Sequence, residues 1–229
     1  MSDRTSEWFV PKFGSQKFRK SIGVLYLPYT AIVTCFAILG AITEPMDIER
    51  IIAISVIYFL SLGVSAHLLD AIGGKTKPWG DLPKLKLCAI ALFVLGIAFT
   101  IGLYYAFLDS PLLFPIGIIE GFFLFAYNLE LFGGKFHNKK STVFSWGVLP
   151  VFAGSAIQTN SITIEALIIS GIAAIITYIL IKNSRPYKIL KQTNGDINEI
   201  KKKEIILKLL SVGVVVGTLI FFIIRYFSM

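Results

Sequence analysis

The chain alternates between long apolar segments and short polar connections. A helix needs roughly 20 mostly apolar residues to cross a hydrocarbon core about 30 Å thick, because lipid offers no partner to an exposed backbone group. Seven segments reach or approach this length, and the fifth contains Pro150, which removes a backbone donor and should kink it. They cover residues 22–42, 51–72, 85–108, 112–132, 143–158, 162–181 and 205–227. The pattern predicts an all-α, polytopic transmembrane helical bundle of about seven spans.

The composition agrees with this prediction. Of the 229 residues, 55% are hydrophobic and only 16% are charged, whereas about a quarter of the residues in a soluble domain are charged. The length fits a single transmembrane domain over residues 1–229. Within it we expect an N-terminal cytoplasmic segment over residues 1–21. We also expect a cytoplasmic loop over residues 183–204, the most polar stretch of the chain, and a partly helical form of it stays open.

The positive charges are distributed unevenly between the two sides of the predicted bundle. Only Arg50 and Arg225, out of 22 Lys and Arg residues, fall on the side opposite the N-terminal segment. Cytoplasmic flanks of membrane spans retain Lys and Arg, so this sorting predicts a cytoplasmic N-terminus, an external C-terminus and a multi-pass protein of the cell membrane. The net charge of +8 then belongs to the membrane flanks and does not indicate a nucleic-acid partner.

Candidate chemistry begins at the end of the second segment. His67 and Asp70 are three residues apart, which places them on one helical face. A glycine pair follows and should end the helix, and Lys75 and Lys77 come next. An imidazole and a carboxylate above a loop with two cations could hold a metal-bound anion. The alternative is a hydrogen-bonded pair at a helix end beside lysines of the membrane interface.

The fourth segment returns to the same side and ends in a similar way. Tyr127 and Glu130 share a helical face by the same spacing, and a Gly-Gly-Lys sequence follows them. Both segments therefore deliver a carboxylate to one membrane face. Two alternatives stay open: Tyr127 as an interfacial anchor, and Glu130 as the partner of a nearby lysine. His137 is interpreted as a solvated loop residue.

Three further features lie inside or next to the spans. Glu120 precedes Glu130 by ten residues, or about 15 Å of helix, and an acid near mid-membrane is either hydrogen-bonded or faces a wet cavity. Small residues around Gly154 in the fifth segment should permit close helix contact. The basic cluster over 182–188 carries no carboxylate, and its simplest interpretation is a positively charged membrane flank.

Several enzyme classes are excluded by what the sequence lacks. Two histidines are too few for a histidine-box membrane oxygenase, and no H-E-x-x-H sequence occurs. The sequence Gly-Gly-Lys-Thr over 73–76 lacks the preceding spaced glycine and strand of a P-loop.

Together these features resemble the UbiA superfamily of intramembrane prenyltransferases. Members are helical bundles, typically of nine spans, that use Mg²⁺ to bind an isoprenyl diphosphate. Their aspartate-rich sequence NDxxDxxxD matches residues 66–74, where His67 replaces the first aspartate, Asp70 keeps the second and Gly74 replaces the third. The tyrosine that ends span 4 in the family resembles Tyr127, and its Gly-x-x-Pro sequence in span 5 resembles residues 147–150.

The chain also departs from the family. The second aspartate-rich sequence should lie near 182–186, where no carboxylate occurs, and one span follows that region instead of three. The resemblance implies Mg²⁺ as cofactor. It also implies the following roles for the residues that match the family's sequences and for residues beside them. They are catalysis by Asp70, Tyr127 and Glu130, metal binding by His67, Asp70 and Glu130, diphosphate binding by Lys75, Lys77, Arg185 and Lys188, and substrate binding by Glu120 and Asn128.

The resemblance implies transfer of an isoprenyl group from an isoprenyl diphosphate to a lipophilic acceptor. The alternative is a non-catalytic UbiA-like membrane protein that binds or moves a lipid or isoprenoid, and the missing second aspartate-rich sequence favours it. A small transporter with Glu120 as a proton-linked site is a third hypothesis, but no inverted repeat accompanies it.

Overall fold

The protein is helical throughout the part of the chain that the structure describes. This computed structural model describes residues 4–43, 45–73, 79–80 and 82–228, and no strand occurs within those ranges. Five helical segments are long and apolar enough to cross a membrane: Gln16–Ala41, Ile48–Gly73, Lys84–Leu108, Ile164–Gln192 and Ile197–Phe227. The prediction of an all-α protein with helices able to span a membrane is confirmed. The side of the membrane that each end faces stays a prediction.

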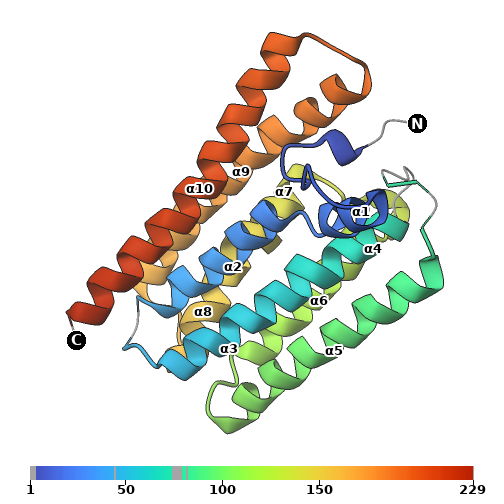
Figure 1. The fold of residues 1–229 in the computed structure, drawn as a ribbon. Coiled ribbons are helices and arrows are strands. Elements are labelled where there is room, and N and C mark those ends of the chain that lie inside the picture. The colour runs from blue at the N-terminus through green and yellow to red at the C-terminus, as the bar shows by residue number, and fades with distance from the viewer. Residues whose placement is uncertain (1–3, 44, 74–78, 81, 229) are drawn as a thin grey trace.

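The first apolar segment is divided between two helices, α1 (Gln16–Val24) and α2 (Leu27–Ala41). Helix α1 begins after Ser15, whose side chain accepts a hydrogen bond from a backbone N–H in the first turn. Tyr26 then adopts the left-handed conformation at φ 45°, and Pro28 lies in the first turn of α2, where its missing donor is not needed. Because of this break, α1 does not continue the line of α2 (Figure 1).

The second segment is a continuous helical rod with a change of winding in its middle. It consists of α3 (Ile48–Tyr58), the π-helical turn η2 (Phe59–Ser65) and α4 (Ala66–Gly73). Asp47 caps its start by accepting hydrogen bonds from the first backbone N–H groups. A π-helical turn inside a helix changes the direction of every side chain beyond it and is frequent at functional sites. It therefore sets the direction of the side chains on α4.

The fourth and fifth predicted segments are not among the five helical segments that are long and apolar enough to cross a membrane. Helix α6 (Leu113–Asn128) has 16 residues. The fifth segment is built from α7 (Lys139–Val143), the π-helical turn η4 (Phe144–Val148) and α8 (Leu149–Thr159). Pro150 lies in the first turn of α8, so the distortion expected there takes the form of the π-helical turn before it. The count of seven spans stays a prediction.

Helices α9 (Ile164–Gln192) and α10 (Ile197–Phe227) form a long antiparallel hairpin (Figure 1). Only residues 193–196 separate them, so the expectation of a loop over 183–204 is wrong for most of that range. The stretch is polar but rich in Lys and Glu, which are good helix formers in water. Asp196 caps α10 with its carboxylate, and the helices therefore extend beyond their apolar parts.

Helix α2 lies at the centre of the bundle, in contact with α3, α8, α9 and α10. Its contact with α8 is very close. A Cβ atom at Gly40 would lie 2.0 Å from the carbonyl oxygen of Val151, and one at Gly154 would lie 2.0 Å from that of Ala37. The prediction of close helix contact around Gly154 is confirmed. Helix α5 (Lys84–Leu108) lies at the edge of the bundle and is mostly exposed.

Candidate functional site

A polar cavity of about 440 Å³ lies at the end of the bundle that carries the N-terminal segment. The N-terminal segment, α4, the end of α6, α7 and the C-terminal half of α9 contribute its walls. Seven of the ten predicted site residues line it: His67, Asp70, Tyr127, Asn128, Glu130, Arg185 and Lys188. Lys75 and Lys77 lie outside the described residues, and Glu120 lines a different cavity. The structure thus brings these seven side chains together, while their roles stay predictions.

Gly73 allows the end of α4 to pack against the end of α6. A Cβ atom at Gly73 would lie 2.7 Å from the carbonyl oxygen of Asn128 and 2.9 Å from the Cα atom of Leu129, so any other residue would push the two ends apart. Asp70 lies one turn earlier on α4, and Glu130 follows α6 with a left-handed backbone at φ 49°. Both half-buried carboxylates face the cavity for this reason. The sequence showed Gly73 only as a helix stop.

Helix α9 supplies two of the three cations that line the cavity. Arg185 and Lys188 are three residues apart and therefore share one face of the helix. The Nη2 atom of Arg185 donates to the hydroxyl of Tyr127 at 3.5 Å, and the Nζ atom of Lys188 lies 5.3 Å from the centre of the Tyr26 ring. Among the residues that the structure describes, neither cation has a carboxylate within 4.0 Å. Their interpretation as a plain membrane flank does not explain why they point inward.

Arg4 is the third cation, and it comes from the other end of the sequence. Its guanidinium donates to the hydroxyl of Tyr26 and to the carboxylate of Glu7, the latter at 3.3 Å, and it lies 5.2 Å from the Trp79 ring. Burial alone would lower the pKa of Arg4, but Tyr26 and Glu7 more than offset this effect, so the pKa is raised above its usual value. Arg4 therefore stays charged at the cavity. In the sequence Arg4 is recognisable only as one of the basic residues of the N-terminal segment.

His67 is buried between aromatic rings. Its ring centre lies 4.8 Å from that of Tyr26 and 5.4 Å from that of Trp146, and its Nε2 atom has no hydrogen-bond partner among the described residues. No group of three or more His, Cys, Asp and Glu side chains in the described ranges is arranged to hold a metal ion. In the described ranges the structure does not bring His67, Asp70 and Glu130 into such a group, and their binding of Mg²⁺ stays a prediction.

His137 lies in the loop after α6, as the sequence suggested, but it is half-buried and packs against Tyr127. Its ring stacks on that of Tyr127 with centres 4.2 Å apart, and its Nδ1 atom lies 3.1 Å from the Tyr127 carbonyl oxygen. The loop after α6 folds back to make this contact, with left-handed conformations at Gly133 and Gly134. His137 thus becomes part of the cavity wall and supports the ring of Tyr127.

The cavity is amphipathic, because aromatic and aliphatic side chains complete its walls: Tyr26, Tyr29, Trp146, Leu180 and Ile181. No protein-family model, curated protein or solved structure matches the chain. The resemblance to the UbiA superfamily stays a prediction.

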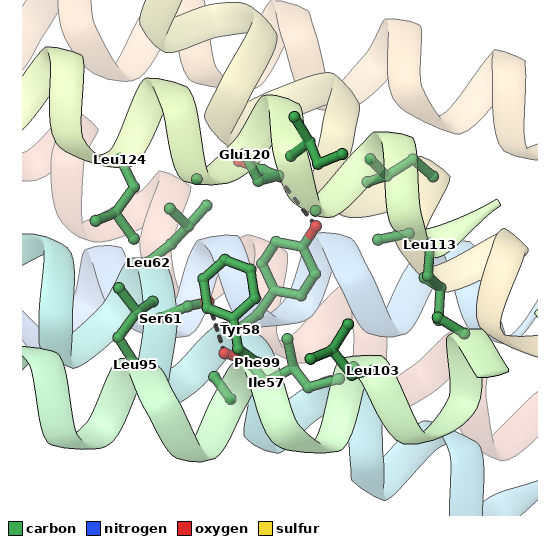
Figure 2. Close-up of a pocket in the computed structure, with 18 of the residues that line it drawn as sticks. Ile57, Tyr58, Ser61, Leu62, Leu95, Phe99, Leu103, Leu113, Glu120 and Leu124 are labelled. Atoms are coloured by element: carbon green, nitrogen blue, oxygen red, sulfur yellow. Dashed lines mark hydrogen bonds between the residues drawn. The ribbon is translucent and has the colours of Figure 1, made fainter. Parts of the chain in front are cut away.

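Glu120 lies in a second cavity, between α3, α5 and α6 (Figure 2), whereas Asp70 lines the polar cavity. Its Oε1 atom accepts a hydrogen bond from the hydroxyl of Tyr58 at 3.1 Å. Glu120 and Asn128, the two predicted substrate-binding residues, therefore line different cavities, and their roles stay predictions. Asn128 is buried in the wall of the polar cavity and donates to the carbonyl oxygen of Leu124 at 2.7 Å.

Proposed function

We propose that the polar cavity binds the diphosphate group of an isoprenyl diphosphate and the first part of its tail. The observation that carries the proposal is the meeting of three cations, Arg4, Arg185 and Lys188, in one cavity that also has aromatic and aliphatic walls. An anion with an apolar tail matches both parts of such a site. Two of the helical segments that line the cavity, Ile48–Gly73 and Ile164–Gln192, are able to span a membrane, so a membrane-dissolved tail has access to it.

The two cations of α9 are the main source of attraction for an anion. Arg4 already forms an ion pair with Glu7 at 3.3 Å, whereas Arg185 and Lys188 have no such partner in the described ranges. Hydrogen bonds between a cation and a phosphate oxygen are roughly twice as strong as neutral ones. Arg185 and Lys188 therefore bind the diphosphate in this proposal, and Arg4 adds to the local positive potential.

Prenyl transfer is the second candidate. The observation that favours it is that two carboxylates, Asp70 and Glu130, line the same cavity as the cations. In the transfer step the allylic C–O bond breaks and diphosphate leaves with the electron pair. The allylic carbon then forms a bond to the acceptor, and the proton that the acceptor loses passes to one of the carboxylates. The three predicted metal ligands do not fit a bound metal ion, so no part of this step is assigned to one.

The test is equilibrium binding of tritiated farnesyl diphosphate to the purified protein in detergent, with farnesol and inorganic diphosphate as competitors. We expect Arg185→Gln and Lys188→Gln to weaken binding by about tenfold each, since each removes a charge-assisted contact worth about 1.4 kcal/mol. Lys182→Gln is the matched control, because Lys182 is an exposed cation on the same helix that does not line the cavity. It should change the affinity by less than about twofold.

Two outcomes decide the proposal. If farnesol competes as well as farnesyl diphosphate, or if both α9 variants bind like the wild type, the cavity does not bind a diphosphate. Adding an aromatic acceptor such as 4-hydroxybenzoate and measuring diphosphate release then separates the two candidates. Release that is lost in Asp70→Asn supports transfer, and binding without release supports a non-catalytic isoprenoid-binding protein.

A further inference from the structure

The second cavity is almost entirely apolar and has a volume of about 140 Å³. It lies between α3, η2, α5 and α6, where Leu95, Phe99 and Leu103 of α5 face Glu120 across the gap (Figure 2). Tyr58 and Glu120 point toward each other from α3 and α6. The cavity thus has one polar feature set in an apolar wall.

One oxygen of Glu120 has no hydrogen-bond partner in the part of the chain that the structure describes. Oε1 accepts from the Tyr58 hydroxyl at 3.1 Å, but Oε2 is shielded from solvent and is unpartnered among the described residues. The nearby Ser61 hydroxyl is not available, because it donates to the carbonyl oxygen of Ile57 at 2.6 Å. A buried polar atom without a partner destabilises the fold, and such atoms are rare in native proteins. Oε2 is therefore a hydrogen-bonding atom that a ligand can satisfy.

The glycines around the cavity keep it open. A Cβ atom at Gly117 would have no atom within 4 Å, and one at Gly102 would have only the Cδ1 atom of Ile57, at 4.0 Å. In a membrane, glycines on a helix usually let a second helix approach. Phe99 approaches the third glycine of the cavity, Gly121, to 3.3 Å from where a Cβ atom would stand, but nothing fills the space beside Gly117. A void therefore remains there between α5 and α6.

The cavity is also accessible from the surface that faces lipid. Among the residues that line it, Ile118 is 72% exposed and Phe99 is 39% exposed. A molecule dissolved in the bilayer can therefore enter from the side, between α5 and α6, without passing through water. This entry is separate from the polar cavity, with which the second cavity shares no lining residue.

We propose that this second cavity binds an apolar, lipid-soluble molecule that carries one hydroxyl group, such as an alkylated phenol. A hydroxyl both donates and accepts, so it can pair with Oε2 of Glu120 whether the carboxyl group is ionised or protonated. An ammonium group would suit only the ionised form, and a carbonyl only the protonated form. A cavity of similar size in a soluble protein binds benzene, so a ring fits here while its alkyl tail extends into lipid.

The test is photolabelling of the protein in phosphatidylcholine vesicles with 4-hexylphenol whose alkyl chain carries a diazirine, followed by peptide mapping. Unlabelled 4-hexylphenol and hexylbenzene serve as competitors at equal mole fractions in the membrane. We expect labels on the peptides of α5 and α6, and we expect the phenol to compete about tenfold more effectively than hexylbenzene. This ratio corresponds to about 1.4 kcal/mol, the contribution of one hydrogen bond.

Two glycine variants provide the matched pair. Gly117→Leu fills the cavity and should reduce labelling at least fivefold, whereas Gly96→Leu on α5 adds the same side chain where a Cβ atom also has open space but outside the cavity. Glu120→Leu should remove the preference for phenol over hexylbenzene. Equal competition by the two compounds in the wild type would overturn the proposal, and so would normal labelling of Gly117→Leu. Binding of farnesyl diphosphate is measured separately, so either proposal can fail alone.

Discussion

Two pairs of helices in this bundle use glycine in opposite ways. Between α2 and α8, Gly40 and Gly154 each let a backbone carbonyl of the other helix approach to 2.0 Å from where a Cβ atom would stand. Between α5 and α6, Gly117 faces a void next to Glu120. A small residue in an apolar span therefore creates either a close contact or a cavity. The outcome depends on whether the backbone of the neighbouring helix approaches the space that the missing side chain leaves.

The closely packed pair should be the more sensitive to substitution. We expect Gly154→Leu to destabilise the protein by about 3 kcal/mol or more, because the side chain would collide with the Ala37 carbonyl oxygen, and overpacking of that kind has no low-cost relief. Gly213→Leu on α10 is the control, since a Cβ atom there meets nothing within 4 Å. Thermal unfolding in detergent, followed by circular dichroism, measures both. Equal melting temperatures for the two variants would contradict the close contact.

At the cavity between α5 and α6, losing the hydrogen bond between Tyr58 and Glu120 should change the stability of the protein more than filling the cavity does. Tyr58→Phe removes the only partner of Oε1 of Glu120 within the described residues and leaves both carboxyl oxygens unsatisfied. We expect a loss of about 1–3 kcal/mol in the free energy of unfolding. Adding Glu120→Leu should recover most of it, because replacing both partners by apolar groups is nearly neutral. If the double variant is less stable than Tyr58→Phe, the carboxyl group has a further partner.

Replacing glycine by alanine, the smallest substitution, should change the stability of the protein in opposite directions at Gly117 and Gly154. Gly117→Ala should stabilise the protein by about 0.5–1 kcal/mol, because alanine has the higher helix propensity and its methyl group meets no other atom. Gly154→Ala should destabilise it for the steric reason given above. Chemical denaturation in mixed micelles compares the two at equal protein concentration. If both variants are more stable than the wild type, α2 and α8 can move apart to accommodate the methyl group.

The weakest predicted effect is a pH dependence at the end opposite the polar cavity. Arg50 donates to both carboxylate oxygens of Asp109, at 3.0 and 2.6 Å, and this hydrogen bonding lowers the pKa of Asp109 below its ordinary value. The pair therefore stabilises the fold above the unfolded-state pKa of about 3.9 and loses this contribution as pH falls through the lower folded-state value. The difference in melting temperature between wild type and Asp109→Asn should be small at pH 6 and should vanish near pH 2. If the difference in melting temperature does not change with pH, the ion pair between Arg50 and Asp109 is not its cause.

The sequence was sufficient to predict the class of fold and the close contact that Gly154 makes between α8 and α2. Hydropathy showed helices able to span a membrane, and the small residues around Gly154 indicated close packing. It was misleading over 183–204, because polarity ends an apolar span without ending the helix, and Lys and Glu continue α9 and α10 in water. Pro150 was expected to kink its span, but the π-helical turn before it could not be read from the sequence.

Residues of the candidate site could be predicted only where their spacing along one helix places them on the same face. Three-residue spacings placed Asp70 with His67, and Glu130 with Tyr127, and a shared membrane face brought the two pairs to one cavity. Arg4 could not be assigned in this way, because its place depends on the N-terminal segment folding back onto Tyr26 and Trp79. Such contacts between distant parts of the chain leave no periodic signal.

The position of Arg4 has a consequence for the order in which the site is assembled. Arg4 leaves the ribosome about 180 residues before the two cations of α9, which corresponds to roughly 10–40 s of synthesis. It can meet Tyr26 and Glu7 almost at once, but the positive potential of the cavity is complete only after α9 has joined the bundle. If the cavity binds an anion as proposed, a nascent chain cannot capture that anion early, and its binding would report that the bundle has been built as far as α9.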